Sequence, residues 1–181
     1  MKAKYTKILC LLLSCILVCG CSSTTDDYSG FIYGNHHIRK ADMGYSPAQV
    51  MASESADFVE ELTPKSKEII ELFGTDSKVS GLTYYDKNVA GHSAEIRYFF
   101  LEDKLVLSAV YLNPLYPGDL FTNLASYYEG EFGYPGESLE RYSSIISSAY
   151  FWEQDGYGFA VALYDNNYIV VMAYNPKTVS L

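Results

Sequence analysis

Helix-period segments and short apolar runs alternate along the chain. In its second half, the apolar residues from Leu120 to Phe132 recur at helical spacing, which predicts a helix capped by Asp119 and closed by Gly133. Three apolar runs then predict strands at 149–153, 158–164 and 168–175. Asp155-Gly156 suits a type I′ hairpin turn between the first two, and Asp165-Asn166-Asn167 a turn between the last two.

The first half has a similar order. Ser46, Pro47 and Gln49 form a capping-box pattern, which predicts a helix from Pro47 with an apolar face of Val50, Met51, Phe58 and Leu62. Thr63-Pro64 either kinks this helix or separates it from a second helix over 65–73, which Gly74 closes. Strands are predicted at 82–85, 94–101 and 105–112, and Glu102-Asp103-Lys104 predicts a hairpin between the last two.

The two halves therefore share an order of helix, closing glycine, loop and three strands that end at Asn-Pro. Gly74 corresponds to Gly133 and Asn113 to Asn175, shifts of 59 and 62 residues. We interpret this as an internal duplication, with repeats at about 46–114 and 115–181; chance similarity of two ordinary segments is the alternative. The predicted fold is α+β, a two-layer sandwich of helices on one face of an antiparallel sheet.

Alternation in the last two predicted strands separates two kinds of side chain. Branched aliphatic and phenylalanine residues share one face, which we expect to meet the helices, while tyrosine, alanine and methionine share the other. An uncharged aromatic face without helices is typical of a ligand or partner surface. The candidate ligand-binding residues are Trp152, Tyr164, Tyr168, Met172 and Tyr174. The alternative is that the N-terminal segment or the other half of the chain covers this face.

The first twenty residues have the pattern of an export signal. Lys2, Lys4 and Lys7 precede an apolar stretch over 8–18, which is shorter than the roughly twenty residues of a membrane span. The four residues Val18-Cys19-Gly20-Cys21 resemble the lipobox of bacterial lipoproteins. This resemblance implies that residues 1–20 are a signal peptide, and that an acylated Cys21 anchors the chain at the extracytoplasmic face of the cell membrane.

Two alternatives to lipidation are an ordinary secreted protein and an uncleaved N-terminal anchor helix. All four cysteines lie at or before Cys21, so the lipidated chain would have no disulfide. The polar residues that follow have no periodicity, and we expect 21–45 to be a flexible tether to a domain over 46–181.

Net charge and tyrosine content limit the classes of partner that the protein can bind. After residue 20 the chain has ten basic and twenty-two acidic residues, a formal charge of −12, which argues against a nucleic-acid partner. It also argues against electrostatic docking on anionic lipid. Seventeen tyrosines follow the leader, and tyrosine suits both a half-buried sheet and a binding surface.

The reactive residue types form no recognisable catalytic pattern. His92 precedes Ser93, but a nucleophile elbow needs glycine where Glu95 stands. His36-His37 lack a third fixed ligand, and the turn at 165–167 lacks the glycine and distal glutamate of a calcium loop. The acid pairs Glu60-Glu61 and Glu102-Asp103 are interpreted as solvated surface. We expect no metal, no cofactor and no catalytic residue.

These patterns together predict a membrane-anchored, non-enzymatic binding or assembly module whose partner is a protein, a peptide or a glycan. A cell-envelope hydrolase of unfamiliar type, using His92 or an acidic pair, is a second hypothesis, and an accessory or structural lipoprotein is a third. The folded part also loosely resembles small envelope modules of the β-lactamase-inhibitor and outer-membrane-assembly lipoprotein type. That resemblance is in element order, charge and tether, and no functional residue follows from it.

Overall fold

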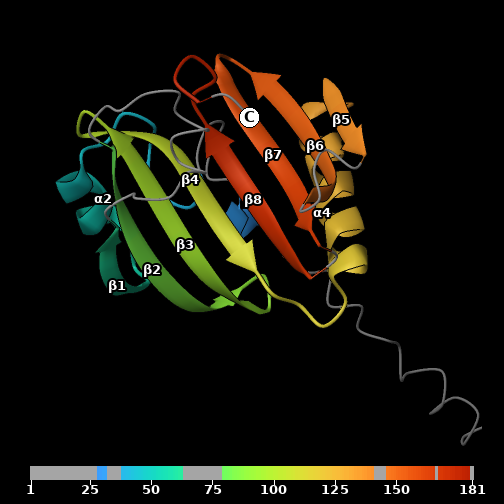
Figure 1. Ribbon diagram of the computed structural model, residues 1–181, viewed down its shortest axis with the longest axis horizontal. Coiled ribbons are helices and arrows are strands. Elements are labelled where there is room, and N and C mark those ends of the chain that lie inside the picture. The colour runs from blue at the N-terminus through green and yellow to red at the C-terminus, as the bar shows by residue number, and fades with distance from the viewer. Residues whose placement is uncertain (1–27, 32–37, 63–78, 141–145, 166, 180–181) are drawn as a thin grey trace, which may run out of the picture.

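One antiparallel sheet of eight strands dominates the computed structural model, which describes residues 28–31, 38–62, 79–140, 146–165 and 167–179 (Figure 1). The strand order is β1-β2-β3-β4-β8-β7-β6-β5. The elements are η1 (Tyr28–Phe31), α2 (Pro47–Ser53), β1 (Asp57–Leu62), β2 (Val79–Val89), β3 (His92–Leu101), β4 (Lys104–Leu112), α4 (Pro117–Phe132), β5 (Glu137–Glu140), β6 (Ile146–Gln154), β7 (Tyr157–Tyr164) and β8 (Tyr168–Tyr174). The protein is therefore α+β, as the sequence predicts.

Tight turns produce the hairpins of the sheet. Ala90 and Gly91 join β2 to β3, and Asp155 and Gly156 join β6 to β7. All four residues have positive φ, at 48°, 81°, 53° and 82° in turn, as a type I′ turn requires. The turn between β3 and β4, Glu102-Asp103, has φ values of 50° and 60°. The hairpins predicted at Glu102-Asp103 and at Asp155-Gly156 are confirmed.

The centre of the sheet is the pairing of β4 with β8, which are distant in the sequence. Leu107 lies opposite Tyr174 and Leu112 lies opposite Ile169 in an antiparallel register. On one side of this pair the chain runs β1 to β4, and on the other side β5 to β8. The β4–β8 pair therefore joins two four-stranded meanders into one sheet.

Helix α4 covers one face of the second meander (Figure 1). Its buried residues Leu120, Leu124 and Tyr128 belong to the same core cluster as the aliphatic side chains of β7 and β8, so the predicted assignment of this face is confirmed. The helix begins at Pro117, two residues before the predicted cap Asp119. Proline is suited to the first helical position because its φ is already helical.

Helix α2 begins where the capping box predicts but ends early. The Ser46 and Gln49 side chains accept hydrogen bonds from each other's backbone N–H groups, whereas the predicted continuation to Leu62 is wrong. The chain becomes extended at Glu54, whose carboxylate accepts hydrogen bonds from the N–H groups of Ser55 and Ala56 at 2.7 and 2.9 Å. These bonds hold a turn where another helical turn would form, and β1 follows. The second predicted helix, 65–73, lies outside the described residues.

Glu54 also lies at the centre of a buried polar cluster. Its side chain is 2% exposed, and its carboxylate accepts hydrogen bonds from Arg39 Nε and Nη2 at 2.9 and 2.8 Å and from the Tyr98 hydroxyl. Arg39 also forms a salt bridge with Asp86 of β2, with 3.0 Å between Arg39 Nη1 and Asp86 Oδ2. Burial alone would raise the pKa of Glu54, but the hydrogen bonds from Arg39 and Tyr98 outweigh it and lower that pKa. The carboxylate is therefore charged at neutral pH.

The cluster helps to attach the segment before α2 to the sheet. Phe31 and Ile38 are fully buried in the core under the sheet. The Gly44 N–H donates to the Leu105 carbonyl, and the Leu105 N–H donates to the Tyr45 carbonyl, both at 2.8 Å. Of the tether expected at 21–45, residues 28–31 and 38–45 are thus part of the folded domain, because their few apolar side chains complete its core.

Tyr98→Phe is expected to lower the free energy of unfolding by about 2 kcal/mol, because it removes a hydrogen bond to a buried carboxylate and keeps the ring. Tyr128→Phe is the matched control, since the buried Tyr128 hydroxyl has no hydrogen-bond partner in the described part of the chain. Its loss is expected to be neutral or stabilising by up to about 1 kcal/mol. Urea titrations measure both values, and equal destabilisation by the two variants would contradict the assigned role of Glu54.

Candidate binding face

The side chains of the sheet that point away from α4 form what we call the helix-free face. Its centre is apolar and buried: Ala109, Ala160, Ala162 and Val170 are at most 1% exposed, Tyr174 is 5% exposed and Met172 is 7% exposed. Val179, near the C-terminus, belongs to the same buried cluster. The expectation of a broad open aromatic face is therefore corrected, since two of its predicted binding residues, Met172 and Tyr174, are buried.

Tyr174 is buried partly because of the glycine opposite it. Gly158 of β7 pairs with Tyr174 of β8, and a Cβ atom at Gly158 would lie 2.1 Å from Tyr174 Cζ. The tyrosine ring therefore occupies the space above the glycine, in the way that aromatic side chains compensate for glycine in other sheets. We conclude that Tyr174 has a packing role in this face.

Trp152 lies on the opposite face from the other four predicted residues. It pairs with Phe159 on the side that α4 covers, and its ring stacks on Tyr128 with 5.5 Å between centroids. The indole N–H donates to the Gly133 carbonyl at 2.9 Å, and the residue is 3% exposed. Trp152 therefore fastens the end of α4 to the sheet, and it shares no surface with Tyr164 or Tyr168.

Tyr164 and Tyr168 remain half-buried at one end of the helix-free face. They are paired across β7 and β8, and their rings stack almost in parallel, with centroids 4.9 Å apart and an interplanar angle of 9°. Tyr111 of β4 lies opposite Val170, which places it diagonally next to Tyr168 on the same face. Three tyrosines from three adjacent strands therefore form the first part of a row.

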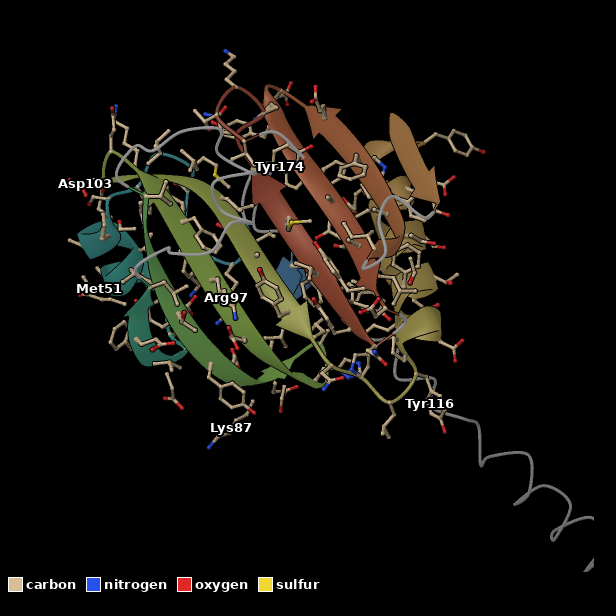
Figure 2. The ribbon with its side chains drawn as sticks, in the orientation of Figure 1. Met51, Lys87, Arg97, Asp103, Tyr116 and Tyr174 are labelled. Atoms are coloured by element: carbon tan, nitrogen blue, oxygen red, sulfur yellow. The ribbon has the colours of Figure 1, made fainter. Side chains whose placement is uncertain are left out.

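The row continues onto β3 through a cation. The Arg97 guanidinium lies over the Tyr111 ring, 4.6 Å from its centroid, and Arg97 Nε donates to the Glu95 carboxylate. Glu95 of β3 lies opposite Tyr111 of β4 on one side and opposite Tyr85 of β2 on the other. Tyr85 is 39% exposed. Figure 2 shows Arg97 on the viewer's side of β3. We call Tyr85, Glu95, Arg97, Tyr111, Tyr168 and Tyr164 the tyrosine–arginine row.

The charges of the row are set by its neighbours. Burial alone would lower the pKa of Arg97, but Tyr111 and Glu95 outweigh it and raise that pKa, so the guanidinium stays cationic. Burial raises the pKa of Tyr111 against the opposing effect of Arg97, so the phenol stays neutral. The side chains of Arg97 and Glu95 are 37% and 41% exposed, which makes their pair a weak contributor to stability and leaves both groups accessible.

Of the residues in this row, the sequence predicts only Tyr164 and Tyr168 as binding residues. The signal was present in the strand Ala94–Leu101, where Glu95 and Arg97 alternate with the buried Ile96 and Tyr98. Polar residues at every second position of a buried strand indicate a surface-facing side. The β3–β4 hairpin places these two beside Tyr111, but that Tyr111 lies next to Tyr168 depends on the β4–β8 pairing, which the alternation alone does not determine.

The other candidate groups are dispersed. His92 is the first residue of β3, and Ser93 follows it in the strand, so the two side chains point to opposite faces. Glu60-Glu61 and Glu102-Asp103 are exposed, and Asp165 occupies a turn with a φ of 48°. His36 and His37 lie outside the described residues. Within the described ranges, no group of three or more His, Cys, Asp or Glu side chains is placed to hold a metal ion.

Among the described residues, none of the helices has the length and apolar character needed to cross a bilayer. No known protein family matches the chain, and no curated protein sequence matches it.

Gly158→Ala is expected to lower the free energy of unfolding by about 2 kcal/mol or more, because the added methyl group displaces the buried ring of Tyr174. Gly130→Ala is the control: it lies in α4 with open space around it, and the change is expected to stabilise by about 0.5–1 kcal/mol. Thermal unfolding of both variants distinguishes the two effects. A neutral Gly158→Ala variant would show that Tyr174 is not held in this position.

Proposed function

We propose that the protein is a non-enzymatic binding module, anchored by lipid at the extracytoplasmic face of the membrane, and that its tyrosine–arginine row binds a protein, peptide or glycan partner. The observation that carries this proposal is the accessible row on the face that α4 does not cover. The predicted binding residues Tyr164 and Tyr168 belong to it. Met172 and Tyr174 belong to the buried cluster against which Tyr111, Tyr164 and Tyr168 pack, and Trp152 has no part in the row.

The chemistry of the row suits recognition. Tyrosine rings offer apolar faces with a hydroxyl tip and lose little conformational entropy when they are bound, and arginine adds a cation with several donors. Tyrosine and arginine are enriched at protein interfaces and among the residues that dominate binding energy. The ring stacking and the Arg97–Tyr111 contact organise these groups before a partner arrives, which lowers the entropic cost of binding.

The proposed anchor would keep this surface near the membrane. Tyr28 lies seven positions after Cys21, and its ring packs on Tyr127 of α4 at 5.7 Å between centroids. A chain of this length spans at most about 25 Å. With Cys21 lipidated, the domain would therefore bind partners close to the bilayer surface rather than at the end of a long tether.

We also propose that the two meanders arose by duplication. Each consists of four antiparallel strands, and each ends in a strand at the middle of the sheet, followed by Asn-Pro. The turns Ala90-Gly91 and Asp155-Gly156 occupy corresponding positions between the second and third strands and have nearly the same φ values. In this view the helices of the two repeats, α2 and α4, form the second layer of a two-layer sandwich.

Lipidation is tested by labelling a bacterial host that expresses the full chain with an alkyne analogue of palmitate. The wild-type protein is expected to take up the label and to partition into the detergent phase, because two or more acyl chains anchor a protein firmly. Cys21→Ser is expected to lose both properties, whereas Cys19→Ser is the matched control and is expected to keep them. Label on the Cys21→Ser protein would refute the assigned anchor.

Binding is tested by calorimetry of the purified protein against soluble peptidoglycan fragments and a panel of envelope oligosaccharides and peptides. Arg97→Ala and Tyr168→Ala are each expected to weaken the affinity for a bound probe at least about tenfold, equivalent to about 1.4 kcal/mol. Tyr134→Ala is the control, since Tyr134 is 87% exposed and lies outside the row. Wild-type affinity in both row variants, with folding intact, would exclude the row as the binding surface.

A further inference from the structure

The edge of the sheet formed by β1 is unusually exposed. β1 is the terminal strand of the sheet and pairs only with β2 among the described strands, so its outer edge lacks a strand partner there. Residues Asp57 to Glu61 are all exposed. An edge strand of this kind presents backbone N–H and C=O groups that another extended chain can pair with.

Large apolar side chains gather at this edge. Phe58 and Val59 of β1 are 52% and 53% exposed, and Met51 of the adjacent helix α2 is 48% exposed. Tyr85 of β2, directly opposite Asp57, is 39% exposed. Four of the seven exposed large hydrophobic residues in the described part of the chain therefore lie on or beside β1. Figure 1 shows α2 and β1 together at this side of the sheet, and Figure 2 places Met51 at its outer margin.

The charge of the edge limits which strand can pair with it. Asp57, Glu60 and Glu61 provide three acids in a strand of six residues that contains no basic residue. A second copy of the chain would place these acids opposite its own, and like charges in facing strands are destabilising. A strand with lysine or arginine at alternate positions would instead place its basic side chains beside Asp57 and Glu60, which share one face, and its apolar side chains on the face of Phe58.

We propose that β1 is a docking edge for an extended segment of a partner protein in which basic and apolar residues alternate, and that this segment adds to the sheet as a ninth strand. Backbone pairing would supply affinity, and the acids with the apolar side chains would supply selectivity. This site is separate from the proposed function of the tyrosine–arginine row, although Tyr85 lies at the boundary of both.

The register of β1 is compatible with this role. Phe58 lies opposite Tyr84 and Glu60 opposite Thr83, so Val59 is the extra residue of a bulge. Bulges and charges at sheet edges act against uncontrolled pairing between copies of a protein. The acids do not repel a strand that carries basic residues. The stretch Glu60–Leu62 after the bulge is regular, so an added strand can form backbone hydrogen bonds with it in register.

The test uses fluorescence anisotropy of the full chain with a labelled peptide of alternating lysine and valine, three of each. The matched peptide replaces each valine by proline, which keeps the charge, removes the valine N–H donors and fixes φ near −65°, so that a paired strand is disfavoured. The protein variant is Glu60→Lys/Glu61→Lys. Its matched control is Glu129→Lys/Glu131→Lys, which makes the same change in net charge on the exposed surface of α4.

We expect the lysine–valine peptide to bind, with affinity reduced at least about tenfold by Glu60→Lys/Glu61→Lys, and less than about twofold by the α4 control. The proline peptide should bind at least about tenfold more weakly. The proposal is overturned by no binding of the lysine–valine peptide, by equal binding of the two peptides, or by equal effects of the two variants. It is also overturned if sedimentation shows a dimer that depends on Glu60 and Glu61, since a second copy would then be the occupant.

Discussion

The structure depends on the antiparallel pairing of β4 with β8. This pair joins two meanders that are otherwise local in sequence, and it makes their strands into one continuous sheet. Both faces of the joined centre are apolar and buried, so the sheet behaves as a central layer that needs cover on each side. On one face, α4 and the N-terminal segment supply that cover, while on the other Val179 belongs to the same buried cluster as Tyr174 and the alanines of the sheet.

The burial of the centre of the sheet on both faces explains where side chains remain accessible to a partner. The centre of the helix-free face is buried, and partially exposed groups remain at its end and at its edge. There Arg97, Tyr111 and Tyr168 come together from three strands, each on the same side of the sheet. At the edge, the Glu54 cluster secures the chain just before β1 and leaves β1 itself exposed.

Local patterns predicted much of the fold because their physical causes are local. The turns at Glu102-Asp103 and Asp155-Gly156 follow from residues that accept positive φ, and the two faces of β7 and β8 follow from the alternation of side chains. The sequence predicts too long a helix from Pro47, because Phe58 and Leu62 continue a helical spacing, whereas the helix ends at Ser53. Its true end depends on the Glu54 carboxylate, whose partners Arg39 and Tyr98 are distant in the sequence.

The sequence by itself determined the α+β class, most strands and their faces, and the tyrosine pair Tyr164 and Tyr168. These depend on backbone preferences and side-chain alternation within a few residues. Only the tertiary structure decided that Met172 and Tyr174 are buried, that Trp152 faces α4, and that Tyr111 lies next to Tyr168. Exposure and contact between strands depend on which strands become neighbours and what packs over them, and no short stretch of sequence contains that information.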